Sequence, residues 1–67
     1  MIFAERLKEK RKNKKLTQKE LAEQLGIKQN TYSDWERGKT QPNLDYLTKL
    51  ANILETTTDD LLGIKKT

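Results

Sequence analysis

The chain has 67 residues, which is enough for one small domain with a modest core. It contains neither cysteine nor histidine, which excludes disulfides, thiolate metal sites and the most common general base. The formal net charge of +4 is compatible with a nucleic-acid partner. The apolar runs are too short for a membrane span and the N-terminus lacks a signal-peptide layout, so we expect a cytoplasmic protein without a membrane partner.

The first predicted helix covers residues 2–13. Phe3 and Leu7 mark its buried stripe, and Arg11 continues that stripe with a long aliphatic stem. Lys10 occupies a position where a second apolar residue would suit the core. The polar segment 13–15 predicts a turn with a positive φ near its end, although it contains no glycine.

Positive charge is concentrated in residues 6–15, which carry seven Lys or Arg and a single Glu. In an arbitrary small protein such a run is a solvated helix face. Next to an element that binds nucleic acid, such a run would also attract phosphate, so both interpretations stay open.

A second helix is predicted over residues 18–25. Thr17 and Glu20 have the spacing of a capping box, in which side chain and backbone satisfy each other at a helix start. Gly26 ends the helix because glycine adopts the left-handed conformation without strain. Ile27 follows as an apolar pivot.

A third helix is predicted over residues 29–37. Tyr32 and Trp35 are three residues apart, which places both on its inner face, and Gly38 closes it. Two short helices joined by a glycine-containing turn make a helix-turn-helix over residues 17–37. The second helix of such a motif can enter the major groove of DNA.

The C-terminal part predicts two more helices. Asn43 caps a helix over residues 44–54, and Thr57 with Asp60 forms a second capping box before a short helix that Gly63 stops. The apolar positions of the longer helix are Leu44, Leu47, Leu50, Ala51 and Leu54. We therefore expect an all-α bundle of about five short helices over residues 1–64, with a basic tail at 65–67.

Enzymatic interpretations fail on the residues. Gly38-Lys39-Thr40 is similar to the end of a P-loop, but Ser33 stands where the upstream glycine is required. The pair Asp59-Asp60 fits the first turn of a helix better than a metal site. No nucleophile is paired with a base, so we predict no enzyme, metal, cofactor or small-molecule ligand.

From Leu16 to Gly63 the sequence resembles the Cro/CI-type (Xre-like) helix-turn-helix domains of phage and bacterial repressors. The matching strings are Leu-Thr-Gln-Lys-Glu-Leu-Ala, Leu-Gly-Ile, Trp-Glu-Arg-Gly-Lys, Pro-Asn-Leu and Asp-Asp-Leu-Leu-Gly. The resemblance implies a lambda-repressor-like fold whose third helix reads DNA. It also implies a dimer on two major-groove half-sites about 34 Å apart. Lys15 and Lys28 depart from the family pattern, and Lys28 gives up a good N-cap.

The resemblance assigns candidate contacts residue by residue. The expected base-reading residues are Lys28, Gln29, Asn30, Ser33 and Asp34. The expected phosphate contacts are Gln18, Thr31, Arg11, Lys39, Thr40 and Asn43. Amide side chains can pair with adenine N6 and N7, although they are also ordinary on an exposed helix. Asp34 either accepts from cytosine or repels phosphate. Thr31 can also offer its methyl to a thymine or act as a partly buried spacer. Helix capping is enough to explain Asn43, and it can hold both that role and the phosphate contact.

Other residues are expected to support the third helix. Arg11 and Glu36 occupy positions that often form an ion pair in the family, although they can equally be unconnected surface charges. The resemblance places Gln18 against the first residues of the third helix. Tyr32 and Trp35 are expected in the core, with the indole of Trp35 partly exposed.

Two functions are compatible with these features. The first is a sequence-specific DNA-binding transcription regulator, a repressor that occupies an inverted-repeat operator as a dimer. The second is a protein-interaction module on the same fold, such as an antitoxin-like partner or an assembly domain. Ile53, Leu62 and Ile64 could form its surface, or equally the homodimer contact of the first.

Overall fold

The computed structural model describes residues 2–64, and within this span it contains five helices and no strand. The helices are α1 (Ile2–Asn13), α2 (Gln18–Leu25), α3 (Gln29–Arg37), α4 (Leu44–Ile53) and α5 (Thr58–Leu62). The predicted all-α fold is confirmed, and α4 ends one residue earlier than expected because Leu54 is its C-cap. None of these helices is both long and apolar enough to cross a bilayer. The basic tail predicted at 65–67 lies outside the described residues.

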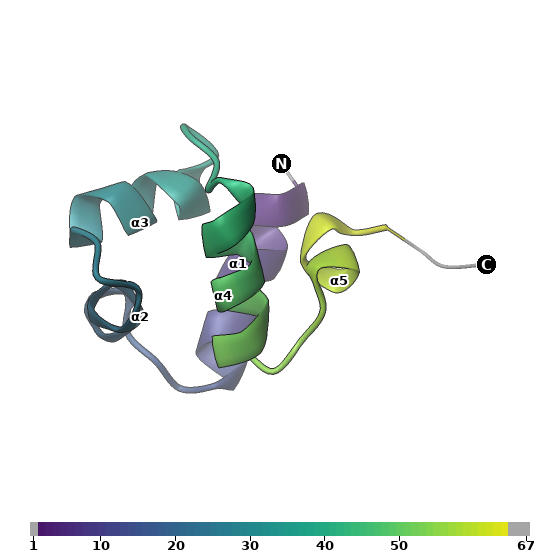
Figure 1. Cartoon of the computed structure of the whole chain (residues 1–67), viewed down its shortest axis with the longest axis horizontal. Helices are drawn as coiled ribbons and strands as arrows, with labels where there is room; N and C mark the ends of the chain where they lie inside the picture. The colour runs from purple at the N-terminus through teal and green to yellow at the C-terminus, as the bar shows by residue number, and fades with distance from the viewer. Residues whose placement is uncertain (1, 65–67) are drawn as a thin grey trace.

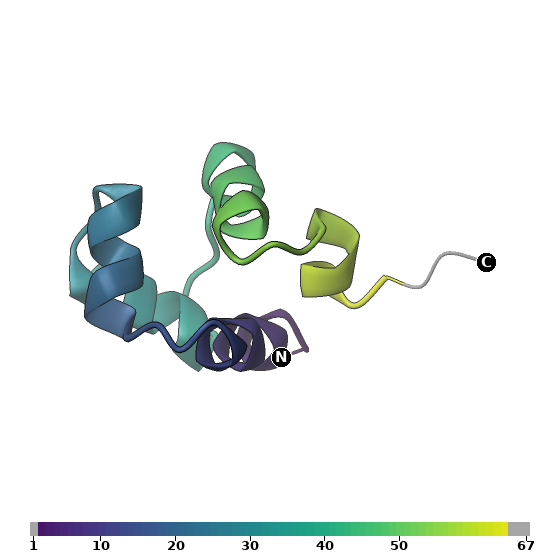
Figure 2. The ribbon, with the colours of Figure 1, turned by 90° about the horizontal axis from the view of Figure 1, so that it is seen from below.

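The helix-turn-helix and α5 lie at opposite ends of the molecule (Figures 1 and 2). Helices α2 and α3 pack together at one end, and α1 and α4 fill the middle. Helix α1 packs against both α3 and α5. It is therefore the common support for both ends of the fold.

Local capping sets the boundaries of the helix-turn-helix. The Thr17 hydroxyl accepts from the Glu20 N–H at 3.0 Å, and the Glu20 carboxylate accepts from the Thr17 N–H at 2.9 Å. This confirms the predicted capping box. Gly26 ends α2 with a φ of 71°. Lys15 has a φ of 57°, so the positive φ expected without a glycine is also confirmed.

The core lies between all five helices. Tyr32 is fully buried and Trp35 is only 4% exposed, which confirms both as core residues and shows that the predicted exposure of the indole is wrong. Leu44 follows the apolar spacing of α4 but is 74% exposed. It is the first residue of α4, where no neighbouring element covers it, whereas Leu47 one turn later is buried.

An acidic residue in α5 fastens this helix to α1. Thr57 accepts from the N–H of Asp60 at 3.0 Å, but the reciprocal half of the predicted capping box is not formed. The Asp60 carboxylate instead meets Lys10 at 2.8 Å, Arg6 at 3.4 Å and the Thr56 hydroxyl at 2.7 Å. Lys10 therefore occupies an apolar stripe position because it has an anionic partner opposite.

Candidate nucleic-acid interface

The outer face of α3 and the residue before it carry polar side chains that point to solvent. Lys28, Gln29, Asn30 and Thr31 are exposed, so the interpretation of Thr31 as a partly buried spacer is wrong. Within residues 2–64, the side chains of Gln29 and Asn30 form no hydrogen bond with one another or with other groups. Their amides are therefore available to a ligand.

The remaining two candidate base-reading residues lie one turn further along α3. Ser33 and Asp34 are half-exposed. The Ser33 hydroxyl accepts from Arg37 at 3.3 Å, and the backbone carbonyl of Asp34 accepts from the Lys39 N–H at 2.9 Å. The structure brings the candidate residues of α3 together along one helix, with Ser33 and Asp34 less accessible than the first turn.

Lys28 is the N-cap of α3 and leaves this helix start without a side-chain cap. Its backbone is extended, with φ −73° and ψ 145°, and its side chain makes no capping hydrogen bond. The expected loss of a good N-cap is therefore confirmed. The first N–H groups of α3 are consequently not satisfied by a side chain of the N-cap residue.

The inner side of α3 is held by a polar cluster around Glu36. Arg11 Nε lies 2.6 Å from Glu36 Oε2, and Arg11 Nη2 lies 3.1 Å from Oε1. Gln18 Nε2 donates to Oε1 at 3.0 Å, and the Tyr32 hydroxyl donates to Oε2. The side chains of Arg11 and Glu36 are only 11% and 3% exposed. We call these four residues, Arg11, Gln18, Tyr32 and Glu36, the Glu36 cluster; its ion pair confirms the one expected between the first and third helices.

The electrostatics of the cluster keep its charges fixed near neutral pH. Burial alone would raise the pKa of Glu36, but the hydrogen bonds from Arg11, Tyr32 and Gln18 outweigh it and lower the pKa. The hydrogen bond to Glu36 raises the pKa of Arg11. Burial, followed by the hydrogen bond to Glu36, raises the pKa of the Tyr32 hydroxyl, which therefore stays protonated and remains a donor.

Two predicted phosphate contacts have structural partners. Gln18 was expected against the first residues of α3, but its side chain instead binds Glu36 in the last turn of that helix. Arg11 is buried, and its remaining donor Nη1 binds the Leu16 carbonyl at 2.8 Å. The geometry gives Arg11 the work of supporting α3, whereas Gln18 is half-exposed and has a second amide hydrogen.

The loop after α3 places the other predicted phosphate contacts. Lys39 and Thr40 are exposed, and the backbone N–H of Thr40 also points to the Asp34 carbonyl, at 3.5 Å. Asn43 Oδ1 accepts from the Tyr46 N–H at 2.9 Å, which confirms its capping role. The loop start is thereby tied to the last turn of α3, with two polar side chains directed outward.

The basic run of residues 6–15 is largely used inside the protein. Arg6 and Lys10 pair with Asp60, Arg11 pairs with Glu36, and Lys14 pairs with Glu55. The remaining cations of the run form no ion pair with any residue of the described span, and they are Lys8, Lys12 and Lys15. The charge available to a polyanion is therefore smaller than the sequence count suggests.

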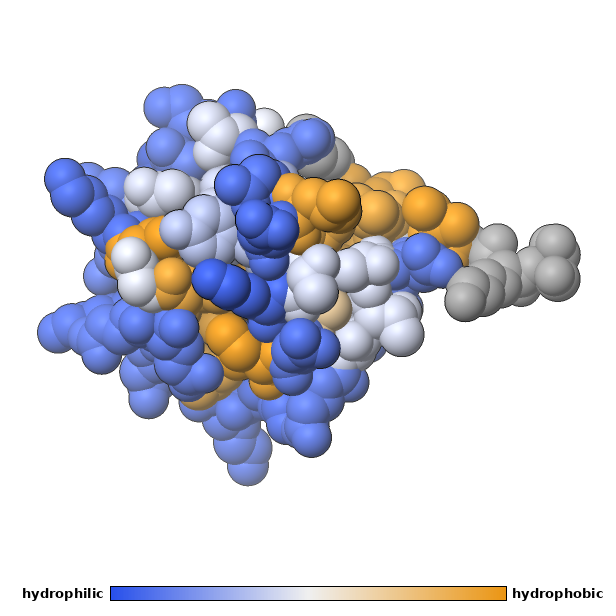
Figure 3. Space-filling view, in the orientation of Figure 1, coloured by the Kyte–Doolittle hydropathy of each residue, from blue (hydrophilic) through white to orange (hydrophobic). Residues whose placement is uncertain are grey.

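An apolar area at the α5 end was only partly anticipated from the sequence (Figure 3). The exposed large apolar side chains are Ile2 at 59%, Leu44 at 74%, Leu62 at 42% and Ile64 at 56%. Of the residues named in advance for such a surface, Ile53 instead packs against the core. Positions at helix ends carry no periodic signal, which explains why Ile2 was missed.

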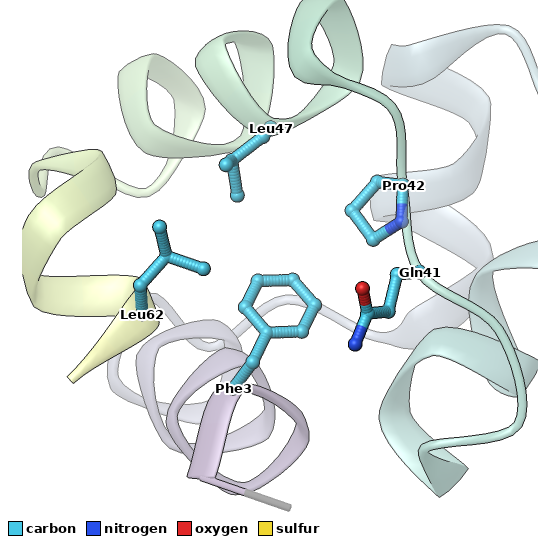
Figure 4. Close-up of a pocket in the computed structure, with 5 residues that line it drawn as sticks. All are labelled: Phe3, Gln41, Pro42, Leu47 and Leu62. Carbon is cyan, nitrogen blue, oxygen red and sulfur yellow. The ribbon is translucent and has the colours of Figure 1, made fainter.

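A hollow of about 130 Å³ opens beside this area. Figure 4 shows the side chains that line it pointing toward one another, from the start of α1, the loop before α4, α4 itself and α5: Phe3, Gln41, Pro42, Leu47 and Leu62. We call the exposed apolar side chains of Ile2, Leu44, Leu62 and Ile64 the apolar end.

Comparison with known proteins agrees with this geometry. A family model of helix-turn-helix proteins (HTH_3) matches residues 7–61. Over 61 residues the chain is 48% identical to the SPbeta prophage-derived uncharacterized HTH-type transcriptional regulator YonR of Bacillus subtilis, covering 91% of this chain and 56% of that protein.

Two further relatives are named for opposite effects on transcription, one as an activator and one as a repressor. The chain is 42% identical over 63 residues to the HTH-type transcriptional activator BcrR of Enterococcus faecalis, covering 94% of this chain and 31% of that protein. It is 36% identical over 63 residues to the cryptic phage CTXphi transcriptional repressor RstR of Vibrio cholerae, covering 94% of this chain and 56% of that protein. The chain thus spans about half the length of these relatives, or less. Each name describes a transcription regulator, which agrees with the prediction that the chain is not an enzyme.

Proposed function

This chain belongs to the helix-turn-helix family matched over residues 7–61, and from that premise we propose that it is a sequence-specific transcription regulator that binds double-stranded DNA through α3. The observation that carries the proposal is the division of α3 into two faces. Tyr32, Trp35 and Glu36 are held inside, whereas Gln29 and Asn30 are exposed and their amides have no partner within residues 2–64. A helix fixed on one side and polar on the other suits major-groove reading.

In this proposal, reading and anchoring are done by different residues. Bases are read by Lys28, Gln29, Asn30, Ser33 and Asp34. Phosphates are contacted by Gln18, Thr31, Lys39, Thr40 and Asn43. Thr31 lies in the first turn of the reading helix and the others precede or follow it, and contacts of this kind carry no sequence information themselves. Arg11 supports α3 through Glu36 instead of reaching a phosphate.

We further propose that two copies bind an inverted repeat and meet through the apolar end. An exposed apolar surface with a hollow beside it is typical of an interaction site. Its α5 part lies at the opposite end of the molecule from α2 and α3, so contact there leaves the reading helices free (Figure 1). Occupation of a promoter in this way would repress transcription, and the relative from Vibrio cholerae is named a transcriptional repressor.

Two substitutions test the division between reading and anchoring. We expect Gln29→Ala to relax the base preference at one position of the selected site, at a cost of about 1–3 kcal/mol in discrimination. Lys39→Ala should weaken binding to every duplex. It should also reduce by about one the slope of the logarithm of the binding constant against the logarithm of salt concentration. Both are measured by fluorescence anisotropy across a salt series. An unchanged preferred sequence in Gln29→Ala would show that α3 is not the reading helix.

The apolar end also favours a second candidate, a protein-interaction module of the antitoxin-like or assembly type. In that case the same surface holds a different protein, and the chain binds duplex DNA only weakly at low salt. Leu62→Lys separates the two functions. For the regulator, it should lower affinity for a two-half-site duplex while leaving a single half-site unaffected.

A further inference from the structure

Tyr32 is fully buried on the inner face of α3, where a phenylalanine ring would fill the same space. Its ring packs edge-on against Trp35, with the ring centroids 5.9 Å apart. Its hydroxyl reaches Glu36 one turn further along the helix. A buried hydroxyl is unfavourable unless it is hydrogen-bonded, so packing alone does not explain why this residue is a tyrosine.

The Glu36 carboxylate has its acceptor positions filled from three helices. Oε1 accepts from Arg11 Nη2 in α1 and Gln18 Nε2 in α2, while Oε2 accepts from Arg11 Nε and from the Tyr32 hydroxyl in α3 itself. An ionised carboxylate offers about four such positions. With the Glu36 side chain 3% exposed, water does not readily replace a lost donor.

The orientation of this carboxylate sets where the start of α2 lies against the end of α3. Gln18 is the first residue of α2, and its side chain bonds Glu36 in the last turn of α3. The Tyr32 hydroxyl adds no charge to the Arg11–Glu36 pair. It instead fixes the orientation of the Glu36 carboxylate, because it holds one carboxylate oxygen while the other oxygen accepts from Gln18.

We propose that the Tyr32 hydroxyl is a positioning residue for DNA reading, acting through Glu36 and Gln18 on the placement of α3 relative to α2. The proposal rests on the DNA-binding function proposed above. Specific binding needs the phosphate contacts at the start of α2 and the base contacts of α3 at the same time, whereas non-specific binding needs phosphate contacts alone. Loss of the hydroxyl should therefore reduce selectivity more than general affinity for DNA.

Tyr32→Phe is the direct test because it removes one oxygen and keeps the ring. We expect affinity for the duplex selected from a random pool to fall about tenfold, the effect of a buried hydrogen bond to a charged group. Affinity for a scrambled duplex of the same length should change by less than about twofold. Tyr46→Phe is the matched control, since Tyr46 also packs against Trp35, at 5.8 Å, while its hydroxyl donates no hydrogen bond within the described span. It should leave the ratio of the two affinities unchanged.

A second variant keeps the test decisive if Tyr32→Phe is not fully helical by circular dichroism. Gln18→Met removes the other uncharged donor from a half-exposed position outside the core, and it should lower the same ratio. Loss of a phosphate contact alone would instead lower both affinities equally. In the double variant, the two losses of selectivity should be less than additive because both act through one carboxylate.

The outcomes separate this proposal from the function on which it rests. If the unmodified chain selects a sequence and Tyr32→Phe and Gln18→Met both keep its full selectivity, the positioning role is wrong and the regulator function stands. If the unmodified chain selects no sequence, the proposed function fails and the positioning role fails with it.

Discussion

Two carboxylates fasten short helices to α1, one at each end of the fold, and they differ in how much water reaches them. Glu36 holds α3 with a side chain that is 3% exposed and accepts from Arg11, Gln18 and Tyr32. Asp60 holds α5 with a side chain that is 39% exposed. The end that carries the candidate reading helix is therefore held by a buried ion pair, and the end that carries the apolar surface is held by a solvent-exposed ion pair.

The difference in hydration changes how much each ion pair contributes to stability. A buried pair is costly to break because the remaining partner is left charged and without water. An exposed pair competes with water and salt, and it contributes little. We infer that the structure fixes α3 against α1 and α2 firmly, while α5 has more freedom to adjust to a contact.

The largest expected effect is the loss of stability when the buried Arg11–Glu36 ion pair is broken. Glu36→Ala leaves the Arg11 guanidinium buried without its anion, and it should cost about 3 kcal/mol of unfolding free energy. Asp60→Ala is the matched control and should cost clearly less. Urea denaturation followed by circular dichroism at neutral pH measures both. Equal losses of unfolding free energy for the two variants would contradict the contrast between the buried and the exposed ion pair.

A smaller effect is expected from acid. The pKa of Glu36 is lowered in the folded state because the hydrogen bonds from Arg11, Tyr32 and Gln18 outweigh burial, which alone would raise it. Its stabilisation is therefore complete above about pH 4.3, the ordinary pKa of glutamate, and is lost as the pH falls through the lowered pKa. Glu36→Gln should flatten the loss of stability in acid.

Asp60→Asn sharpens this comparison. The pKa of Asp60 is also lowered, chiefly by the hydrogen bond from Lys10, so this variant should flatten the acid loss too. At about 1 M salt the screening length falls to about 3 Å, and the exposed contribution should shrink while that of Glu36 persists. The check is stability against pH at two salt concentrations. An Asp60 contribution that resists salt as well as that of Glu36 does would contradict the account.

The smallest expected effect comes from the links that lead into α2 and α5. Lys15 and Glu55 both have positive φ, 57° and 54°, which disfavours residues other than glycine. Lys15→Gly should stabilise the chain by about 0.5–1 kcal/mol, because the relieved left-handed strain of about 1–2 kcal/mol exceeds the entropic cost of a glycine. Lys15 also has no ion pair within the described span that the change would remove. Glu55→Gly should gain less, since it loses the pair with Lys14. Thermal unfolding of the two variants provides the test, and a larger gain for Glu55→Gly would reverse the expected order.

Sequence reasoning worked where the signal is local. The Thr17–Glu20 capping box and the left-handed Gly26 depend on residues a few positions apart, and they placed α2 correctly. The core roles of Tyr32 and Trp35 followed from helical spacing in the same way.

Sequence reasoning failed where the partner is distant in the chain. Lys10 looked like a vacant apolar position because its partner Asp60 is 50 residues away. The true partner of Gln18 could not be predicted because the rotation of α3 against α2 is set by tertiary packing. The bond from Tyr32 to Glu36 joins residues four apart in one helix, so helical spacing could have indicated it. Leu44 matched the apolar period of α4, but periodicity does not say whether another element covers the first turn of a helix.

The most direct test of the central claim is selection of bound duplexes from a random DNA pool by the purified chain near physiological salt. The account predicts enrichment of a two-fold symmetric sequence, with half-sites about one helical turn apart. Absence of any enrichment, with binding only at low salt, would contradict the assignment of α3 as a DNA-reading helix.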